Sequence, residues 1–113
     1  MANEALAASR TPSAVAGLAQ FFPEASPVRI PVRVIRLKQG ASLSEETVIE
    51  FGTPDEALFA SSLPLEFEDG VKLENADGSL SAEAKVVAVQ YQQGHTAVAA
   101  RFVRHIANWI IQR

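Results

Sequence analysis

The chain has 113 residues, of which 48% are hydrophobic and 20% charged, with a formal net charge of −3 and a pI near 5.3. This length suits a single domain, and the apolar fraction excludes wholesale disorder. No apolar run approaches the roughly 18 residues of a membrane-spanning helix, and residues 1–22 lack a signal-peptide pattern, so we expect no membrane association. The chain has no cysteine, which excludes disulfides and thiolate metal sites and favours a cytoplasmic location. The acidic balance argues against a protein that coats DNA or RNA.

Residues 1–26 differ in composition from the rest of the chain. They are rich in Ala and Ser and lack the period-two pattern of strands. Residues 13–22 are compatible with a short helix capped by Ser13, and we expect Phe21 and Phe22 to pack against another segment. We interpret residues 1–26 as a flexible N-terminal arm outside the main core.

From Val28 the pattern changes to strict alternation. Apolar residues at 28, 30, 32 and 34 alternate with Arg29, Pro31 and Arg33, which predicts a strand with both arginines on the face opposite the valines. Pro31 cannot donate a hydrogen bond to a neighbouring strand, so we expect the strand to begin at a sheet edge or beside an irregularity.

The alternation shifts by one residue at Val34 and Ile35. Leu37 is then apolar, whereas Arg36 and Lys38 are predicted to point away from the core. A β-bulge at this position would account for the shift, and bulges often turn the strands of barrels.

Five further strands are predicted downstream, each bounded by turn residues. Asp77 and Gly78 are the pair typical of a tight hairpin, and residues 92–95 form a second turn. Leu65 and Phe67 are expected to share one face of their strand. The five segments are residues 47–51, 57–61, 65–74, 80–91 and 96–103. Six short strands at regular spacing predict a small antiparallel β-barrel or sandwich.

The end of the chain has helical rather than strand periodicity. Ile106, Trp109 and Ile110 stand at helical spacing, which predicts a short helix at about 104–112. The stretch is too short and too weakly basic for a membrane anchor, so we expect it to dock on the barrel. The predicted domain therefore comprises residues 27–113.

Residues suited to catalysis are few. His95 and His105 are the two histidines of the chain, and no metal-binding spacing includes them. The acidic residues of the middle of the chain alternate with apolar ones, which is typical of a solvated strand face. Phosphate-binding and nucleophile motifs are absent from the sequence. We therefore expect no enzyme, no catalytic residue, no metal and no cofactor.

Charge is concentrated in two parts of the chain. Arg29, Arg33, Arg36 and Lys38 lie within ten residues that contain no acid, whereas residues 39–79 contain ten acidic residues and one lysine. Arginine pairs with phosphate and stacks on flat rings, so the basic strand is a candidate anion site. Alternatively, these charges discourage edge-to-edge pairing of an edge strand.

Six segments, in this order and spacing, carry a resemblance to a known family. They are Val-Arg-Ile-Pro-Val-Arg-Val at 28–34, Glu-Thr-Val-Ile-Glu at 46–50, Ala-Leu-Phe-Ala at 57–60, Leu-Pro-Leu at 63–65, Ala-Lys-Val-Val-Ala-Val at 84–89 and Ala-Val-Ala-Ala-Arg-Phe-Val at 97–103. Over about residues 25–105 the chain resembles a PilZ domain. The resemblance implies an all-β fold, a six-stranded antiparallel barrel with a C-terminal helix. It also implies a receptor for the bacterial second messenger cyclic di-GMP.

The first ligand motif of the family is matched in part. It is a pair of arginines four residues apart, the second commonly followed by an aliphatic residue and proline. Arg29, Ile30 and Pro31 fit the second position, and Ala25 stands where the first arginine is expected. Arg29 and Arg33 have the required spacing but lie one repeat later, inside the strand.

The second ligand motif is also altered. The family has Asp or Asn, then Ser two residues later, then Gly three residues after that. By resemblance, Glu50 stands for the acid and Thr53 for the serine, with a shifted spacing, and Asp55 or Glu56 stands where glycine is expected. The implied ligand residues are therefore Arg29, Arg33, Glu50 and Thr53.

Two hypotheses about function follow from the resemblance. In the first, the chain is a cyclic di-GMP receptor, with Arg29 and Arg33 on the phosphates or the guanine of the ligand. In the second, it is a PilZ-like domain that has lost the ligand and contacts a protein partner, as in motility or pilus-type regulation. An unrelated barrel that binds single-stranded nucleic acid would need aromatic residues among the basic ones, and residues 28–38 contain none. We expect a monomer or weak dimer.

Overall fold

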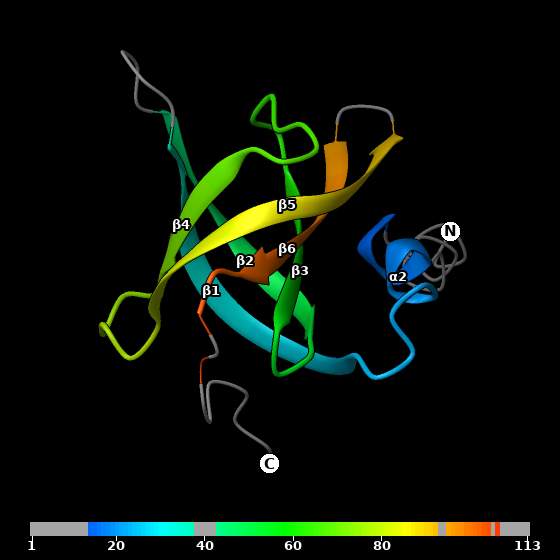
Figure 1. The fold of residues 1–113 in the computed structure, drawn as a ribbon, viewed down its shortest axis with the longest axis horizontal. Helices are drawn as coiled ribbons and strands as arrows, with labels where there is room; N and C mark the ends of the chain where they lie inside the picture. The colour runs from blue at the N-terminus through cyan, green and yellow to red at the C-terminus, as the bar shows by residue number, and fades with distance from the viewer. Residues whose placement is uncertain (1–13, 38–42, 93–94, 105, 107–113) are drawn as a thin grey trace, which may run out of the picture.

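The computed structural model describes residues 14–37, 43–92, 95–104 and 106. Its six strands close into one antiparallel barrel in the order β1-β2-β3-β6-β5-β4, with a short helix, α2, beside it (Figure 1). The predicted six-stranded β-barrel is confirmed. The elements are α2 (Ala14–Ala19), β1 (Ser26–Leu37), β2 (Leu43–Gly52), β3 (Glu56–Ser61), β4 (Gly70–Glu74), β5 (Ser81–Gln92) and β6 (His95–Phe102).

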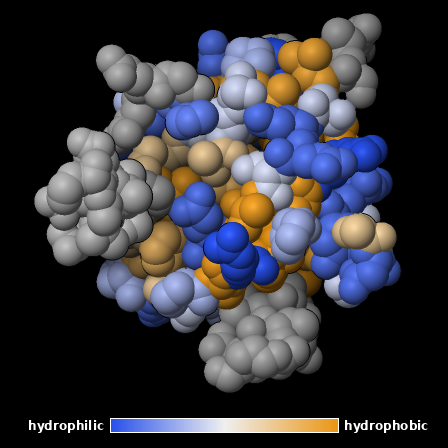
Figure 2. All heavy atoms as spheres, turned by 180° about the vertical axis from the view of Figure 1, so that it is seen from behind, coloured by the Kyte–Doolittle hydropathy of each residue, from blue (hydrophilic) through white to orange (hydrophobic). Residues whose placement is uncertain are grey.

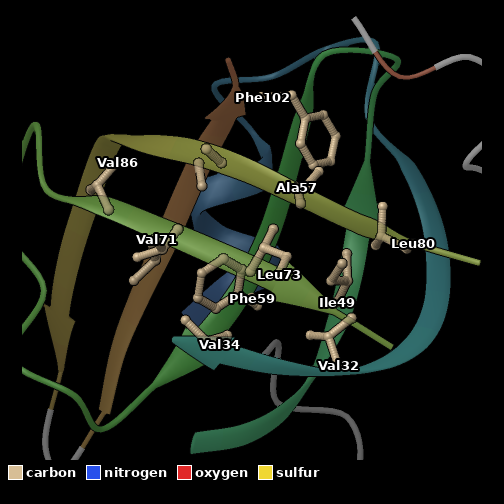
Figure 3. Close-up of a cluster of buried hydrophobic side chains, with 14 of the residues drawn as sticks. Val32, Val34, Ile49, Ala57, Phe59, Val71, Leu73, Leu80, Val86 and Phe102 are labelled. Carbon is tan, nitrogen blue, oxygen red and sulfur yellow. The ribbon is translucent and has the colours of Figure 1, made fainter. Parts of the chain in front are cut away.

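The barrel interior is filled by apolar side chains from all six strands. Those labelled in Figure 3 point toward one another across the interior, and the ring of Phe59 lies among side chains from other strands of the barrel. Phe59, Ile49, Val34 and Leu73 are fully buried. Core residues on the same strand are two positions apart, as are Val32 and Val34 on β1 or Val71 and Leu73 on β4. The period-two pattern of the sequence therefore located the core.

The register of β1 corrects the predicted bulge at Val34 and Ile35. Pairing with β2 runs without interruption from Ile30 to Arg36, and the irregularity lies earlier, between Pro27 and Ile30. Arg36 therefore has the same parity as the buried Val34, and its side chain is only 16% exposed. The prediction that Arg36 points away from the core was wrong. Lys38 lies outside the described residues.

Only part of β1 pairs on both sides. Residues 33–37 pair with β4, whereas residues 26–32 pair with β2 alone among the described strands. Pro31 lies in this singly paired half, next to the irregularity. Its position agrees with the expectation from its missing N–H group.

The remaining strands lie close to their predicted positions, with two exceptions. The first is β2, which begins at Leu43, four residues before the predicted start at 47. The second lies before β4. Residues 65–69 are not strand, and β4 begins only at Gly70. Leu65 is buried whereas Phe67 is 61% exposed, so the expectation that they share a face was wrong. The hairpin between β4 and β5 is confirmed, and Gly78 adopts the positive φ of 79° that favours glycine in such turns.

Helix α2 packs on the outside of the barrel. Val15 and Leu18 are buried against Leu58 of β3 and against Ala97 and Ala99 of β6, in a cluster separate from the barrel interior. Because α2 covers the outer face of β3, that strand is buried on both sides. Phe22 packs against this cluster, as expected, whereas Phe21 is 74% exposed.

Beyond β6 the structure describes Val103, Arg104 and Ile106, and Ile106 packs against the barrel core. The rest of the helix expected at about 104–112 lies outside the described residues, as does His105. None of the described helices is long and apolar enough to cross a membrane.

The surface is mixed in character. The face seen in Figure 2 has a hydrophobic area near its centre with hydrophilic residues around it. Large exposed apolar side chains in the described part of the chain are Phe21, Leu37, Leu43, Phe67, Tyr91 and Val103. They come from separate parts of the chain, some from strands and some from the segments between or beyond them.

Candidate functional site

The outer face of β1 and β2 holds three of the four ligand residues that the resemblance implied. We call it the β1–β2 face and define it by two rows of side chains. The row on β1 is Arg29, Pro31 and Arg33, and the row on β2 is Glu50, Val48 and Glu46. Both arginines are exposed, while Val32 and Val34 on the same strand are buried. The predicted placement of these arginines on the face opposite the valines is therefore confirmed.

Arg29 and Glu50 line one depression of this face. It has a volume of about 370 Å³ and is completed by Ala16 of α2 and by Val28, Val48 and Phe51. The irregularity in β1 explains the meeting of the two charged residues, because it leaves Val28 and Arg29 opposite Glu50. Among the described residues, no carboxylate lies within 4.0 Å of the Arg29 guanidinium.

Arg33 lines a second, larger depression of about 570 Å³. Its Nη2 atom lies 3.3 Å from Oε2 of Glu46, directly across the strand pair, and it donates a hydrogen bond there. On its other side Arg33 is in register with Glu74 of β4, which also lines the depression. The charge of Arg33 is thus set between two acidic residues.

The two arginines do not converge on one point. They are four residues apart along an extended strand, which separates their Cα atoms by about 13 Å. Val48 lines both depressions and lies in register with Pro31, so the middle of the face is apolar. The arrangement is an open two-row surface, and it differs from a clamp around a single phosphate.

Thr53 is placed differently from the other three residues. It is 5% exposed, and its hydroxyl accepts hydrogen bonds from the backbone N–H groups of Asp55 and Glu56 at 3.0 and 2.8 Å. The same hydroxyl donates to Oε1 of Glu56 at 2.5 Å, and Oε2 of Glu56 lies 2.9 Å from Nη2 of Arg101. Thr53 therefore closes the turn between β2 and β3.

Two polar groups at the other end of the barrel were missed by sequence reasoning. The Glu45 carboxylate accepts hydrogen bonds from the hydroxyl of Ser61 at 2.7 Å and from the hydroxyl of Ser62 at 2.5 Å. Burial raises the pKa of Glu45, but these bonds and those from nearby backbone N–H groups outweigh it, and the pKa lies below its ordinary value of 4.5. Glu45 lies four residues before the buried Ile49, so alternation places both on the same face of β2. This spacing was the signal in the sequence that could have identified Glu45 as an inward-facing residue.

The second missed group is the pair of Arg36 and Asp69. Nε of Arg36 lies 3.9 Å from Oδ2 of Asp69, and both side chains are less than one fifth exposed. Oδ2 of Asp69 also accepts the backbone N–H of Glu66 at 2.9 Å, a hydrogen bond within the loop before β4. A correct position for the irregularity in β1 would have placed Arg36 inward.

His95, at the start of β6, is exposed. Among the described residues, no group of three or more His, Asp or Glu side chains is placed to hold a metal ion. Comparison of the chain with protein-family models and with curated proteins finds no match.

Proposed function

We propose that this chain is a PilZ-like, non-catalytic interaction domain that contacts a protein partner through the β1–β2 face. The observation that carries the proposal is the cross-strand pair of Arg33 and Glu46, 3.3 Å apart on an exposed surface. The cation that the family would direct to a ligand phosphate is here matched by a carboxylate.

The charges of the whole β1–β2 face also favour a protein partner over a nucleotide. A dianionic nucleotide placed over Arg29 and Arg33 would also meet Glu46 and Glu50, and Glu74 at the edge of the second depression. Like charges at close range disfavour such a ligand, and mixed charges around an apolar centre suit a protein surface. Thr53 adds no contact to a ligand on this face, because its hydroxyl is engaged in its own turn.

Site-specific photo-crosslinking in the native host tests this proposal. A photo-reactive amino acid at Val48, in the middle of the face, is expected to give a covalent adduct with a protein. The same amino acid at Glu83, an exposed position on β5, is the matched control and should give none. Loss of the Val48 adduct on the substitution Arg33→Glu would support recognition through the charged rows. Equal adducts at both positions, or none at Val48, would overturn the proposal.

A second candidate function is cyclic di-GMP binding, and the position of Arg29 favours it. Arg29 has no carboxylate within ion-pairing distance among the described residues and lines a depression beside α2. Ala25 occupies the place of the family's other arginine, so we expect Ala25→Arg together with Glu50→Gln to create measurable affinity for the nucleotide. If the variant binds cyclic di-GMP and the unmodified chain does not, the site has been lost. If both bind it, the site is intact.

A further inference from the structure

The β1–β2 face is complementary to itself. Its β1 row has the order cation, apolar residue, cation, and its β2 row has the order carboxylate, apolar residue, carboxylate. The register aligns the rows: Arg33 stands across from Glu46 and Pro31 from Val48, with Arg29 and Val28 across from Glu50. Each row therefore faces its chemical complement at the spacing of adjacent strands, about 4.8 Å.

A two-fold axis that lies between the rows and runs along the strands exploits this pattern. Rotation about such an axis turns a second copy to face the first and exchanges the positions of its two rows. Arg33 of one copy then lies over Glu46 of the other, Arg29 over Glu50, and Pro31 over Val48. Because the axis is two-fold, each contact occurs twice, as in any isologous interface.

Other classes of partner match the face less well. An acidic peptide or a nucleotide would pair with the β1 row and be repelled by the β2 row, and a basic peptide would meet the reverse problem. A suitable partner needs two rows of opposite sign on neighbouring strands, in register, with an apolar contact between them. The chain itself carries such a surface.

We propose that this chain forms a weak symmetric homodimer through its β1–β2 face, which makes a second copy of the chain the partner at that surface. The inference rests on the proposed function and names its partner. A standard stable interface has about 20 to 30 residues on each side, and the two rows supply only six side chains. We therefore expect association to be weak and concentration-dependent. The charged side chains fix the orientation of the two copies, and Pro31 and Val48 provide the apolar contact between them.

Sedimentation velocity of charge-row variants tests this proposal. The acidic-face variant carries Arg29→Glu and Arg33→Glu, and the basic-face variant carries Glu46→Arg and Glu50→Arg. Each is expected to dimerise about 100-fold more weakly than the unmodified chain, because all its rows have one sign. An equimolar mixture of the two should form a heterodimer. The control variant, Lys85→Glu with Arg104→Glu, makes the same charge change as the acidic-face variant away from this face and should dimerise like the unmodified chain.

The outcomes separate this inference from the function on which it rests. Circular dichroism of each variant verifies that it is folded. An unmodified chain that stays monomeric together with a mixture that fails to associate would overturn the homodimer, as would an acidic-face variant that dimerises normally. If Val48 then crosslinks to a different protein, the interaction function stands without the homodimer. Saturable binding of cyclic di-GMP that depends on Arg29 would overturn the function itself.

Discussion

Nε of Arg36 lies 3.9 Å from Oδ2 of Asp69 at the end of the barrel where β1 meets β4, and both side chains are mostly buried. Within the described part of the chain this Nε has no hydrogen-bond partner. This nitrogen therefore lacks the hydrogen bond that would offset part of the cost of removing Arg36 from water.

From this geometry we expect unequal effects of removing the two partners. Asp69→Asn leaves the arginine charge without a counter-charge and should lower the free energy of unfolding by about 2 kcal/mol. Arg36→Met keeps the apolar stem and removes the charge, and should cost less than about 1 kcal/mol. Urea denaturation of both variants measures the difference, and a larger loss for Arg36→Met than for Asp69→Asn would refute this view of the pair.

Glu45 should make stability depend on acid pH. Its pKa in the folded chain lies below 4.5, so the stabilisation is fully present above that value and is lost as pH falls through the folded-state pKa. Glu45→Gln should therefore flatten the decline of the urea midpoint between about pH 5 and pH 3. The control is Glu83→Gln at an exposed position. An unchanged pH profile in the Glu45 variant would show that its hydrogen bonds to Ser61 and Ser62 do not stabilise the folded state.

Thr53 should contribute to stability through its hydroxyl. Thr53→Ala removes the acceptor for two backbone N–H groups in a partly buried turn, and we expect a loss of about 2 kcal/mol in the free energy of unfolding. Thr53→Ser retains the hydroxyl and should lose less than about 1 kcal/mol. Thermal unfolding distinguishes the two. Equal stability of all three proteins would contradict the structural role and return Thr53 to the ligand candidates.

The packing of α2 predicts that the helix belongs to the cooperative unit of the barrel. Leu18 is 4% exposed against β3 and β6, so Leu18→Ala should cost about 2 kcal/mol. Phe21→Ala is the matched control, because Phe21 is 74% exposed and should lose less than about 0.5 kcal/mol. Urea denaturation followed by circular dichroism measures both. A Leu18 variant as stable as the control would mean that the helix can leave the barrel without cost.

Sequence patterns located the strands, by alternation in β1, β4 and β5 and by the bounding turn residues in β3 and β6, where three or four consecutive residues are buried. They misplaced the irregularity in β1, since a local shift in alternation does not say where the extra residue lies; only the pairing with β2 does. The identity of Arg36 reinforced the error, because a charged residue is ordinarily expected at the surface. Phe67 was misplaced for the opposite reason, as an apolar residue that the loop before β4 leaves exposed.

The candidate site was predictable one strand at a time. Arg29 and Arg33 stood out as a basic strand, and their exposure followed from alternation. Their acidic neighbours could not be assigned, because the alignment with Glu46 and Glu50 depends on the register between β1 and β2. That register converts an apparent anion site into two rows of opposite charge. The role of Thr53 likewise depended on the three-dimensional turn that encloses it.

Calorimetric titration of the whole chain with cyclic di-GMP most directly separates an interaction domain from a nucleotide receptor. Because carboxylates accompany Arg29 and Arg33 on the β1–β2 face, we expect no saturable heat at about 100 µM ligand. A saturable isotherm in the micromolar range or tighter, abolished by Arg29→Ala, would contradict the proposed function.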